Sequence, residues 1–169
     1  MFYLELFHAL EREQVRYLIV GGVAVNLLGA ERMTMDIDLM VSLDAGNLEK
    51  FLRVARDLQL KPAVLPVTLE QFCDAATVDA WVRDKHMLAF QLRGTAADAP
   101  SVDILVRPVV PFEEAYGRHK RILVGDVTVS VAAPQDIITL KSRTGRQIDQ
   151  SDIRALHRLD ELKSRKRDD

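Results

Sequence analysis

Two aspartates, Asp36 and Asp38, stand one residue apart in the segment "MDIDLMV", and each is followed by an apolar residue. Side chains alternate across a β-strand, so both carboxylates would point to one face while Ile37 and Leu39 point to the other. Two such carboxylates repel each other, and burying them without partners is costly. A divalent cation relieves the repulsion, and Mg²⁺ prefers one or two carboxylates together with phosphate oxygens. The pair therefore predicts a metal site, against the alternative of a solvated strand end.

Two adjacent glycines, Gly21 and Gly22, lie between the apolar segment 16–20 and the Ala- and Leu-rich segment 23–30. We expect a buried strand followed by a short helix. Without Cβ atoms the backbone can approach a ligand closely, and the first N–H groups of the helix are free to bind a phosphate. The alternative is a tight strand-to-helix turn, which accounts for one glycine more easily than for two.

A third carboxylate, Asp103, lies in the apolar segment "SVDILV". With a third strand carboxylate, one metal ion can bind a nucleotide while another activates an attacking hydroxyl, as in two-metal phosphoryl transfer. Taken alone, Asp103 fits a simple strand-end aspartate. Lys141 follows Ile137 and Leu140, so it leaves its predicted helix near the apolar face. A lysine in that place needs a partner, unless its ammonium group reaches solvent.

The elements that would position these residues follow from periodicity and capping signals. A capping box at Thr68 and Gln71 begins one of the predicted helices. We expect a polar turn at 95–100 between two strands, and a hairpin that turns on Gly125 and Asp126. The predicted helices are 2–13, 23–30, 44–60, 68–85, 111–119, 133–145 and 149–165, and the predicted strands are 16–20, 36–42, 86–94, 101–108 and the two arms of 120–131.

Because at least one hairpin is present, a purely parallel sheet is excluded. The fold class is therefore α/β (α+β), with a mixed β-sheet flanked by helices. The pattern contains no linker, so we expect a single domain over 1–169, with a core at about 15–131 and a C-terminal helical part at about 134–163.

The composition is that of an ordinary globular protein: 48% of the 169 residues are hydrophobic, 28% are charged, and the net charge is −2. The overall field does not indicate nucleic-acid binding. The single cysteine, Cys73, excludes an internal disulfide and fits a reducing compartment. No stretch has the ~18 apolar residues that span a membrane, and the N-terminus lacks the pattern of a signal peptide. We expect a cytoplasmic protein without a membrane partner.

The glycine pair, thirteen further residues, the Asp36–Leu39 segment and the later Asp103 together resemble the active-site pattern of the DNA polymerase β-like nucleotidyltransferase superfamily. The string "YLIVGGVAVNLLGAERMTMDIDLMV" looks like small bacterial members related to AbiEii-type toxins. The segment "PQDIITLKSRTGRQIDQSDIRAL" is similar to their C-terminal helices, with Lys141, Arg146, Asp149 and Asp152 at matching places. The resemblance covers roughly 15–42 and 101–159, whereas 60–95 carries no recognised motif.

The resemblance implies a role for each matching residue. Asp36 and Asp38 would bind the metal ion, Mg²⁺ or Mn²⁺, that carries a nucleoside triphosphate. Asp103 would be the third metal ligand and the general base for the acceptor hydroxyl. The two glycines, Gly21 and Gly22, would shape the phosphate-binding turn, and the catalytic set is therefore Asp36, Asp38 and Asp103.

Basic residues complete the predicted nucleotide site. Lys141 would contact the triphosphate, and Arg32 and Thr34, which precede the Asp36 strand, are placed to touch phosphates, although a loop arginine is more often solvated. Asp149 and Asp152 would orient basic groups such as Arg146, or else cap the last helix. Two departures weaken the match: many relatives have serine beside the first glycine, and often a basic residue where Ile148 stands.

The implied activity is transfer of a nucleoside monophosphate from an NTP to a hydroxyl group. The acceptor is left open between a tRNA 3′ end, a partner protein and a small molecule such as an antibiotic. The related families suggest a toxin–antitoxin setting with a cognate toxin or antitoxin as partner. Two other functions stay open: an Asp-x-Asp glycosyltransferase acting on a nucleotide sugar, and a non-catalytic nucleotide-binding or antitoxin-like module with the same fold.

Overall fold

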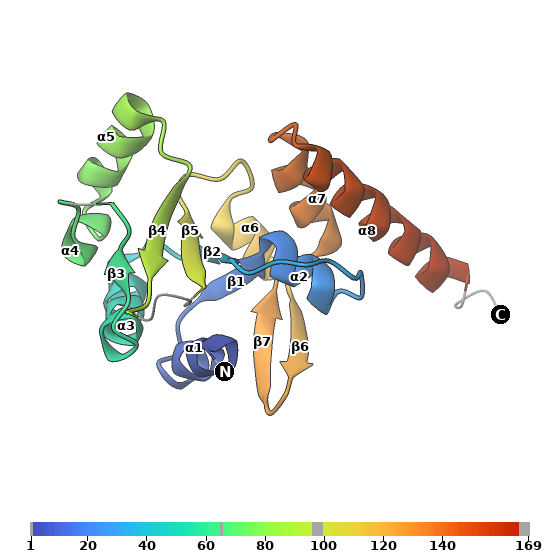
Figure 1. Cartoon of the computed structure of the whole chain (residues 1–169), viewed down its shortest axis with the longest axis horizontal. Helices are drawn as coiled ribbons and strands as arrows, with labels where there is room; N and C mark the ends of the chain where they lie inside the picture. The colour runs from blue at the N-terminus through green and yellow to red at the C-terminus, as the bar shows by residue number, and fades with distance from the viewer. Residues whose placement is uncertain (1, 65, 96–99, 166–169) are drawn as a thin grey trace.

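The computed structural model describes residues 2–64, 66–95 and 100–165, and their strands form one seven-stranded sheet (Figure 1). The order of the strands is β3-β4-β5-β2-β1-β7-β6. The β2–β5 and β1–β7 pairs are parallel and the other neighbours are antiparallel, which confirms the predicted mixed sheet. The strands are β1 (Tyr17–Val20), β2 (Ile37–Val41), β3 (Lys61–Pro62), β4 (Ala89–Arg93), β5 (Ser101–Leu105), β6 (Lys120–Val124) and β7 (Val127–Val131).

Helices flank this sheet, as the sequence predicts. None of the helices in the described part of the chain is long and apolar enough to cross a membrane. The helices are α1 (Phe2–Arg12), α2 (Gly21–Leu27), α3 (Ala45–Asp57), α4 (Leu69–Phe72), α5 (Ala75–Lys85), α6 (Phe112–Gly117), α7 (Pro134–Ser142) and α8 (Gln147–Arg165).

Two details differ from the sequence-based expectation. The single helix expected over 68–85 is wrong, because α4 ends at Phe72 and a second helix begins after Asp74, which caps α5 by accepting a hydrogen bond from the Thr77 N–H. Strand β3 was not predicted, since its Pro62 signals a chain break, but proline is tolerated on an edge strand. The capping box of Thr68 and Gln71 at α4 is confirmed. Residues 96–99 of the expected turn lie outside the described part.

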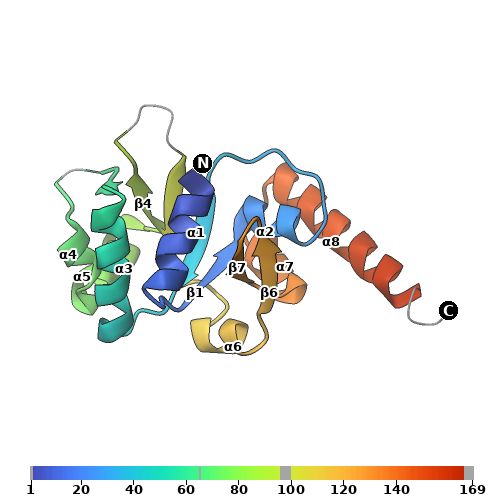
Figure 2. The ribbon, with the colours of Figure 1, turned by 90° about the horizontal axis from the view of Figure 1, so that it is seen from below.

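The helices gather in two groups, one at each end of the sheet. Figures 1 and 2 show α3, α4 and α5 grouped at the β3–β4 end, with α2, α7 and α8 on the side of β1 and β7. Phe72 of α4 and Trp81 of α5 both stack on Phe90 of β4, at 4.7 and 5.7 Å between ring centroids. One face of β4 is thus part of the core.

The opposite face of β4 and β5 is more open. On β4, Phe90 and Leu92 are buried, whereas Ala89 and Gln91 are half-buried and Arg93 is exposed. Strand β1, by contrast, is buried at every position, as expected for a strand covered on both faces. The predicted site residues therefore lie where the sheet passes from a covered region to an uncovered one.

Candidate active site

The predicted carboxylates meet on one face of the sheet. Asp38 of β2 pairs in register with Asp103 of the parallel strand β5, and Asp103 pairs with Gln91 of β4. Residues paired directly across a ladder point to the same side. Asp38, Asp103 and Gln91 therefore form one row across three strands, although more than sixty positions of sequence separate the two aspartates.

Asp36 lies in the neighbouring row. It precedes β2, and its Oδ1 accepts a hydrogen bond of 2.8 Å from the Ser101 hydroxyl. Ser101 stands two residues before Asp103 on β5, so the two share a face. This arrangement puts Asp36 and Asp38 on the same side of the sheet, as their alternation predicts. Ser101 was not singled out from the sequence, although its spacing from Asp103 carries the same period-two signal.

The environment of Asp38 disfavours its charge. Burial, together with the nearby charges of Asp103 and Asp36, raises the pKa of Asp38 to about 6, although Lys141 and the Gly22 N–H act in the opposite direction. Burial also raises the pKa of Asp103. Within the described residues, the buried Asp103 Oδ1 has no hydrogen-bond partner. An unpartnered, buried carboxylate oxygen next to a second carboxylate is the donor set that a cation would satisfy.

Each of the two glycines is needed for a different steric reason. Gly21 has φ +62°, and a Cβ atom there would lie 1.8 Å from Asp38 Oδ2. A Cβ atom on Gly22 would lie 1.7 Å from Arg32 Nη1 and 2.8 Å from Thr34 Oγ1. The glycines are the first two residues of α2 and leave room for the carboxylate on one side and for the guanidinium group on the other. The sequence placed them before the helix, which begins two residues earlier than predicted.

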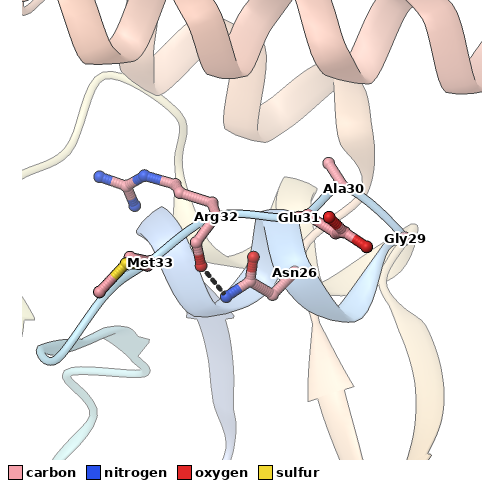
Figure 3. A pocket seen from close by; sticks show the side chains of 6 residues that line it. All are labelled: Asn26, Gly29, Ala30, Glu31, Arg32 and Met33. Atoms are coloured by element: carbon pink, nitrogen blue, oxygen red, sulfur yellow. Dashed lines mark hydrogen bonds between the residues drawn. The ribbon is translucent and has the colours of Figure 1, made fainter.

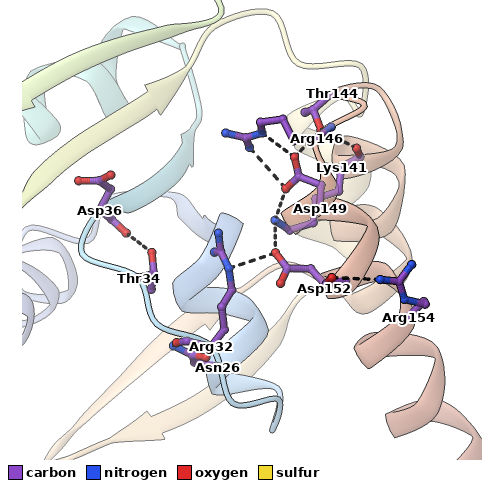
Figure 4. A network of polar contacts seen from close by, with 11 residues as sticks. Asn26, Arg32, Thr34, Asp36, Lys141, Thr144, Arg146, Asp149, Asp152 and Arg154 are labelled. Carbon is purple, nitrogen blue, oxygen red and sulfur yellow. Dashed lines mark hydrogen bonds and ion pairs between the residues drawn. The ribbon is translucent and has the colours of Figure 1, made fainter.

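Three basic side chains, one from α7 and two from the loops before β2 and α8, gather around two carboxylates of α8 (Figure 4). Lys141 of α7 is buried, and its Nζ lies 2.8 Å from Asp149 Oδ1 and 2.7 Å from Asp152 Oδ2. The Arg32 Nε lies 3.3 Å from the same Asp152 oxygen. Arg146 Nε donates to Asp149 Oδ2 at 2.6 Å. The partner that the position of Lys141 requires is therefore a pair of α8 carboxylates.

We call Arg32, Lys141, Arg146, Asp149 and Asp152 the ionic network. Burial alone would raise the pKa of Asp149, but hydrogen bonds from Lys141, Thr144 and Arg146 outweigh it and lower that pKa to about 2. Three cations face two carboxylates, so the network carries a net positive charge. Its charge extends to the sheet, because Lys141 lowers the pKa of Asp38. The network thus both orients basic groups and complements the strand carboxylates.

Removing the central cation of the network should destabilise the protein. In Lys141→Met, two buried carboxylates lose their shared partner, which costs about 3 to 5 kcal/mol when a buried ion pair is broken. We expect this loss in urea unfolding at pH 7 without metal or nucleotide. The loss should shrink as the pH falls, because protonation neutralises the abandoned carboxylates. The exposed Lys120→Met is the control, and a loss as small as that of this control would contradict a structural role for Lys141.

Open hollows surround the loop that carries Arg32. The hollow in Figure 3 measures about 590 Å³ and is lined by Asn26 and residues 29–33. The Asn26 side chain donates to the Arg32 carbonyl at 2.7 Å and holds the loop. A second hollow, of about 500 Å³, runs along residues 32–36 and ends at Asp36. Together they give open space on the approach to Asp36.

No protein-family model and no curated protein matches the sequence. Solved structures do match the fold. The lincomycin-bound lincosamide adenylyltransferase LnuA is 17% identical with a TM-score of 0.59, and the match covers 94% of each chain. ANT(2″)-Ia in complex with adenylyl-2″-tobramycin is 14% identical with a TM-score of 0.57, covering 99% of this chain and 95% of that one.

A nucleotidyltransferase-like protein from Paracoccidioides brasiliensis is 20% identical with a TM-score of 0.54, covering 93% of this chain and 72% of that one. At such identities the similarity is one of fold. The chain therefore has the fold of nucleotidyltransferases, as the sequence resemblance implies. Membership of the AbiEii-related subgroup stays a prediction.

Proposed function

We propose that this chain is a metal-dependent nucleotidyltransferase that transfers a nucleoside monophosphate from an NTP to a hydroxyl group. The observation that carries the proposal is the pairing of Asp38 with Asp103, whose buried Oδ1 has no hydrogen-bond partner within the described residues. A site for a phosphate-bound cation explains why the protein keeps such a costly arrangement. The nucleotidyltransferase fold supports the same activity.

Asp36, Asp38 and Asp103 would hold Mg²⁺ or Mn²⁺. Within the described residues no three His, Cys, Asp or Glu side chains stand close enough together to bind a metal ion by themselves. Mg²⁺ usually takes only one or two carboxylates and completes its shell with phosphates and water, so Asp38 and Asp103 fit it. Asp36 would become a further ligand by exchanging the hydrogen bond that it accepts from Ser101 for a bond to the metal ion. When bound, the metal would neutralise phosphate charge and acidify the acceptor hydroxyl.

The ionic network and the glycine turn would bind the triphosphate. A lysine ammonium has three donors. Lys141 donates one hydrogen bond to Asp149 Oδ1 and forms an ion pair with Asp152 Oδ2, so donor capacity remains for a phosphate oxygen. Arg32 and Thr34, beside Gly22, would contact the same group. Arg146 joins this set, because its side chain is 66% exposed while Asp149 holds one edge of it. Catalysis of this kind depends mostly on positioning and charge stabilisation.

In the reaction, the acceptor oxygen forms a bond to the α-phosphorus and the bond from that phosphorus to the bridging oxygen breaks. The electron pair leaves with pyrophosphate, and Asp103 takes the hydroxyl proton. Because α7 and α8 supply half of the site, we also propose that residues 1–169 act as one domain.

The acceptor and the biological setting are further parts of the proposal. Lincomycin and tobramycin, bound by two proteins of similar fold, favour a small-molecule hydroxyl. A tRNA end, a partner protein and a toxin–antitoxin pair rest on the sequence resemblance alone. A cytoplasmic location follows from the expected NTP substrate.

The test is thermal unfolding with each NTP, with and without Mg²⁺, followed by incubation of the labelled NTP with candidate acceptors. A bound nucleotide at about 100 times its Kd should add about 2.7 kcal/mol of stability, and EDTA should remove that gain. Pyrophosphate release and label on the acceptor should follow. Turnover of a UDP-sugar would instead support the glycosyltransferase. No stabilisation by any Mg²⁺–NTP would overturn the nucleotidyltransferase.

A further inference from the structure

The uncovered face of β3, β4 and β5 continues directly from the carboxylates. Arg93 pairs with Ser101 on one side and with Lys61 of β3 on the other. Since paired residues share a face, Lys61, Arg93, Ser101 and Asp36 form a row parallel to the row of Asp103. The row changes from positive to negative charge as it runs from the sheet edge to the proposed metal site.

The row of Arg93 and the row of Asp103 are close enough for one acceptor molecule to reach both. Asp103 pairs with Gln91, and Arg93 stands two residues further along β4, so Asp103 and Arg93 are diagonal neighbours about 7 to 8 Å apart. A group bound at Arg93 is therefore close to the hydroxyl whose proton Asp103 would take. The long side chains of Lys61 and Arg93 are both exposed, so they can move to meet it.

The two cations, which we call the cationic strip, form no ion pair with an acidic side chain of the described residues. The ion pairs of the described residues all involve other basic side chains. The Arg93 guanidinium instead donates a hydrogen bond to the Gln91 side-chain oxygen at 3.5 Å. Many surface arginines of this protein are paired, such as Arg12, Arg16 and Arg121. The strip therefore places two cations without an ion-pair partner among the described residues next to the reacting position, where the charge of Arg93 acts on Asp103.

We propose that the cationic strip of Lys61 and Arg93 binds a phosphate group of the acceptor, so that the acceptor is a phosphate-bearing molecule. This inference rests on the proposed nucleotidyl transfer and names the substrate class for it. Arg–phosphate pairing supplies strong, oriented hydrogen bonds, and a lysine adds a point charge. A polyamine antibiotic such as tobramycin would be repelled by the same side chains. The reaction joins the acceptor hydroxyl oxygen to the α-phosphorus, releases pyrophosphate and leaves the acceptor's own phosphate unchanged.

The test uses the double variant Lys61→Gln/Arg93→Gln and a matched double, Lys120→Gln/Arg158→Gln, which removes the same charge from exposed positions on β6 and α8. The probes are an oligoribonucleotide with a free 3′ hydroxyl, ribose 5-phosphate, tobramycin and lincomycin. Anisotropy measures oligoribonucleotide binding without NTP, and label transfer from the NTP gives KM for each acceptor. Mg²⁺–NTP stabilisation checks that each variant is folded.

We expect transfer to at least one phosphate-bearing probe, with Kd or KM about tenfold higher in the strip variant and within about twofold of wild type in the matched one. For the single-stranded oligoribonucleotide, the magnitude of the slope of log affinity against log salt concentration should fall by about 1.4, because each of the two lost phosphate contacts contributes about 0.7. A preference for the oligoribonucleotide identifies a nucleic-acid strand, and a preference for ribose 5-phosphate identifies a small phosphate ester.

The inference is overturned by transfer to tobramycin or lincomycin alone, or by equal losses in the two double variants. These failures differ from failure of the proposed function, in which no Mg²⁺–NTP binds the wild-type protein. Even then the anisotropy measurement tests the cationic strip, because oligoribonucleotide binding is measured without NTP.

Discussion

Asp38→Asn should abolish Mg²⁺-dependent nucleotide binding and leave the metal-free protein folded and more stable at neutral pH. The neutral amide removes the charge that attracts the metal ion, and with it the phosphates that the metal would carry. Thermal melts with and without Mg²⁺–NTP should therefore coincide for this variant. Calorimetry should detect no nucleotide heat that depends on Mg²⁺.

The stability gain follows from the raised pKa. Folding raises the pKa of Asp38 from its ordinary 3.8 to about 6, so the folded state holds this proton more tightly than the unfolded state. The free energy of unfolding should thus fall as the pH rises between roughly 4 and 6, by about 3 kcal/mol at most. The amide side chain of the Asp38→Asn variant cannot ionise, so the variant should lose this slope. Urea unfolding in EDTA at pH 4.5 and pH 7.5 measures it.

Two comparisons make the result specific. Asp36→Asn should also lose Mg²⁺–NTP stabilisation, but with a smaller gain of apo stability, because Asp36 already accepts the Ser101 hydrogen bond. Asp160→Asn changes an exposed carboxylate on α8 that forms no ion pair within the described residues, and it should alter neither quantity. Unchanged nucleotide stabilisation in both Asp38→Asn and Asp36→Asn would remove the metal assignment.

The sequence predicts the site where local rules apply. Alternation in a strand gives the shared face of Asp36 and Asp38, and that rule needs no tertiary information. The helical position of Lys141 near apolar residues predicts that it needs a partner, and the partners, Asp149 and Asp152, lie only eight and eleven residues later. Both inferences use spacings within one or two adjacent elements.

Features that depend on the register between distant strands could not be predicted from the sequence. Lys61 and Arg93 share a row with Asp36 only because β3, β4, β5 and β2 are neighbours in that order. The segment that contains β3 and β4 carries no family motif, and Pro62 indicates a break rather than an edge strand. Arg32 gives another example: a loop arginine is usually solvated, but here Gly22 leaves space for it and Asp152 pairs with it.

Asp103→Asn should separate nucleotide binding from chemistry. Asp38 and Asp36 remain to hold a metal with the triphosphate, and the ionic network is untouched, so Mg²⁺–NTP affinity should stay within a few-fold of wild type. Transfer should fall by about a thousandfold or more, because the acceptor hydroxyl loses both a carboxylate to take its proton and a ligand of the activating metal. The paired measurement is nucleotide affinity by calorimetry and single-turnover transfer to an acceptor identified with the wild-type protein.

The pH dependence and a conservative variant distinguish the roles of Asp103. If it takes the proton, the small residual transfer of Asp103→Asn should rise steadily with pH as hydroxide replaces the base, whereas wild-type transfer should level off above the pKa of Asp103. Asp103→Glu keeps the carboxylate and should recover part of the rate, since only its reach has changed. Asp103 Oδ1 has no hydrogen-bond partner in the described protein, so the asparagine breaks no existing hydrogen bond of that atom. Wild-type transfer by Asp103→Asn would reduce this residue to a strand-end aspartate, and two-metal catalysis would have to be abandoned with it.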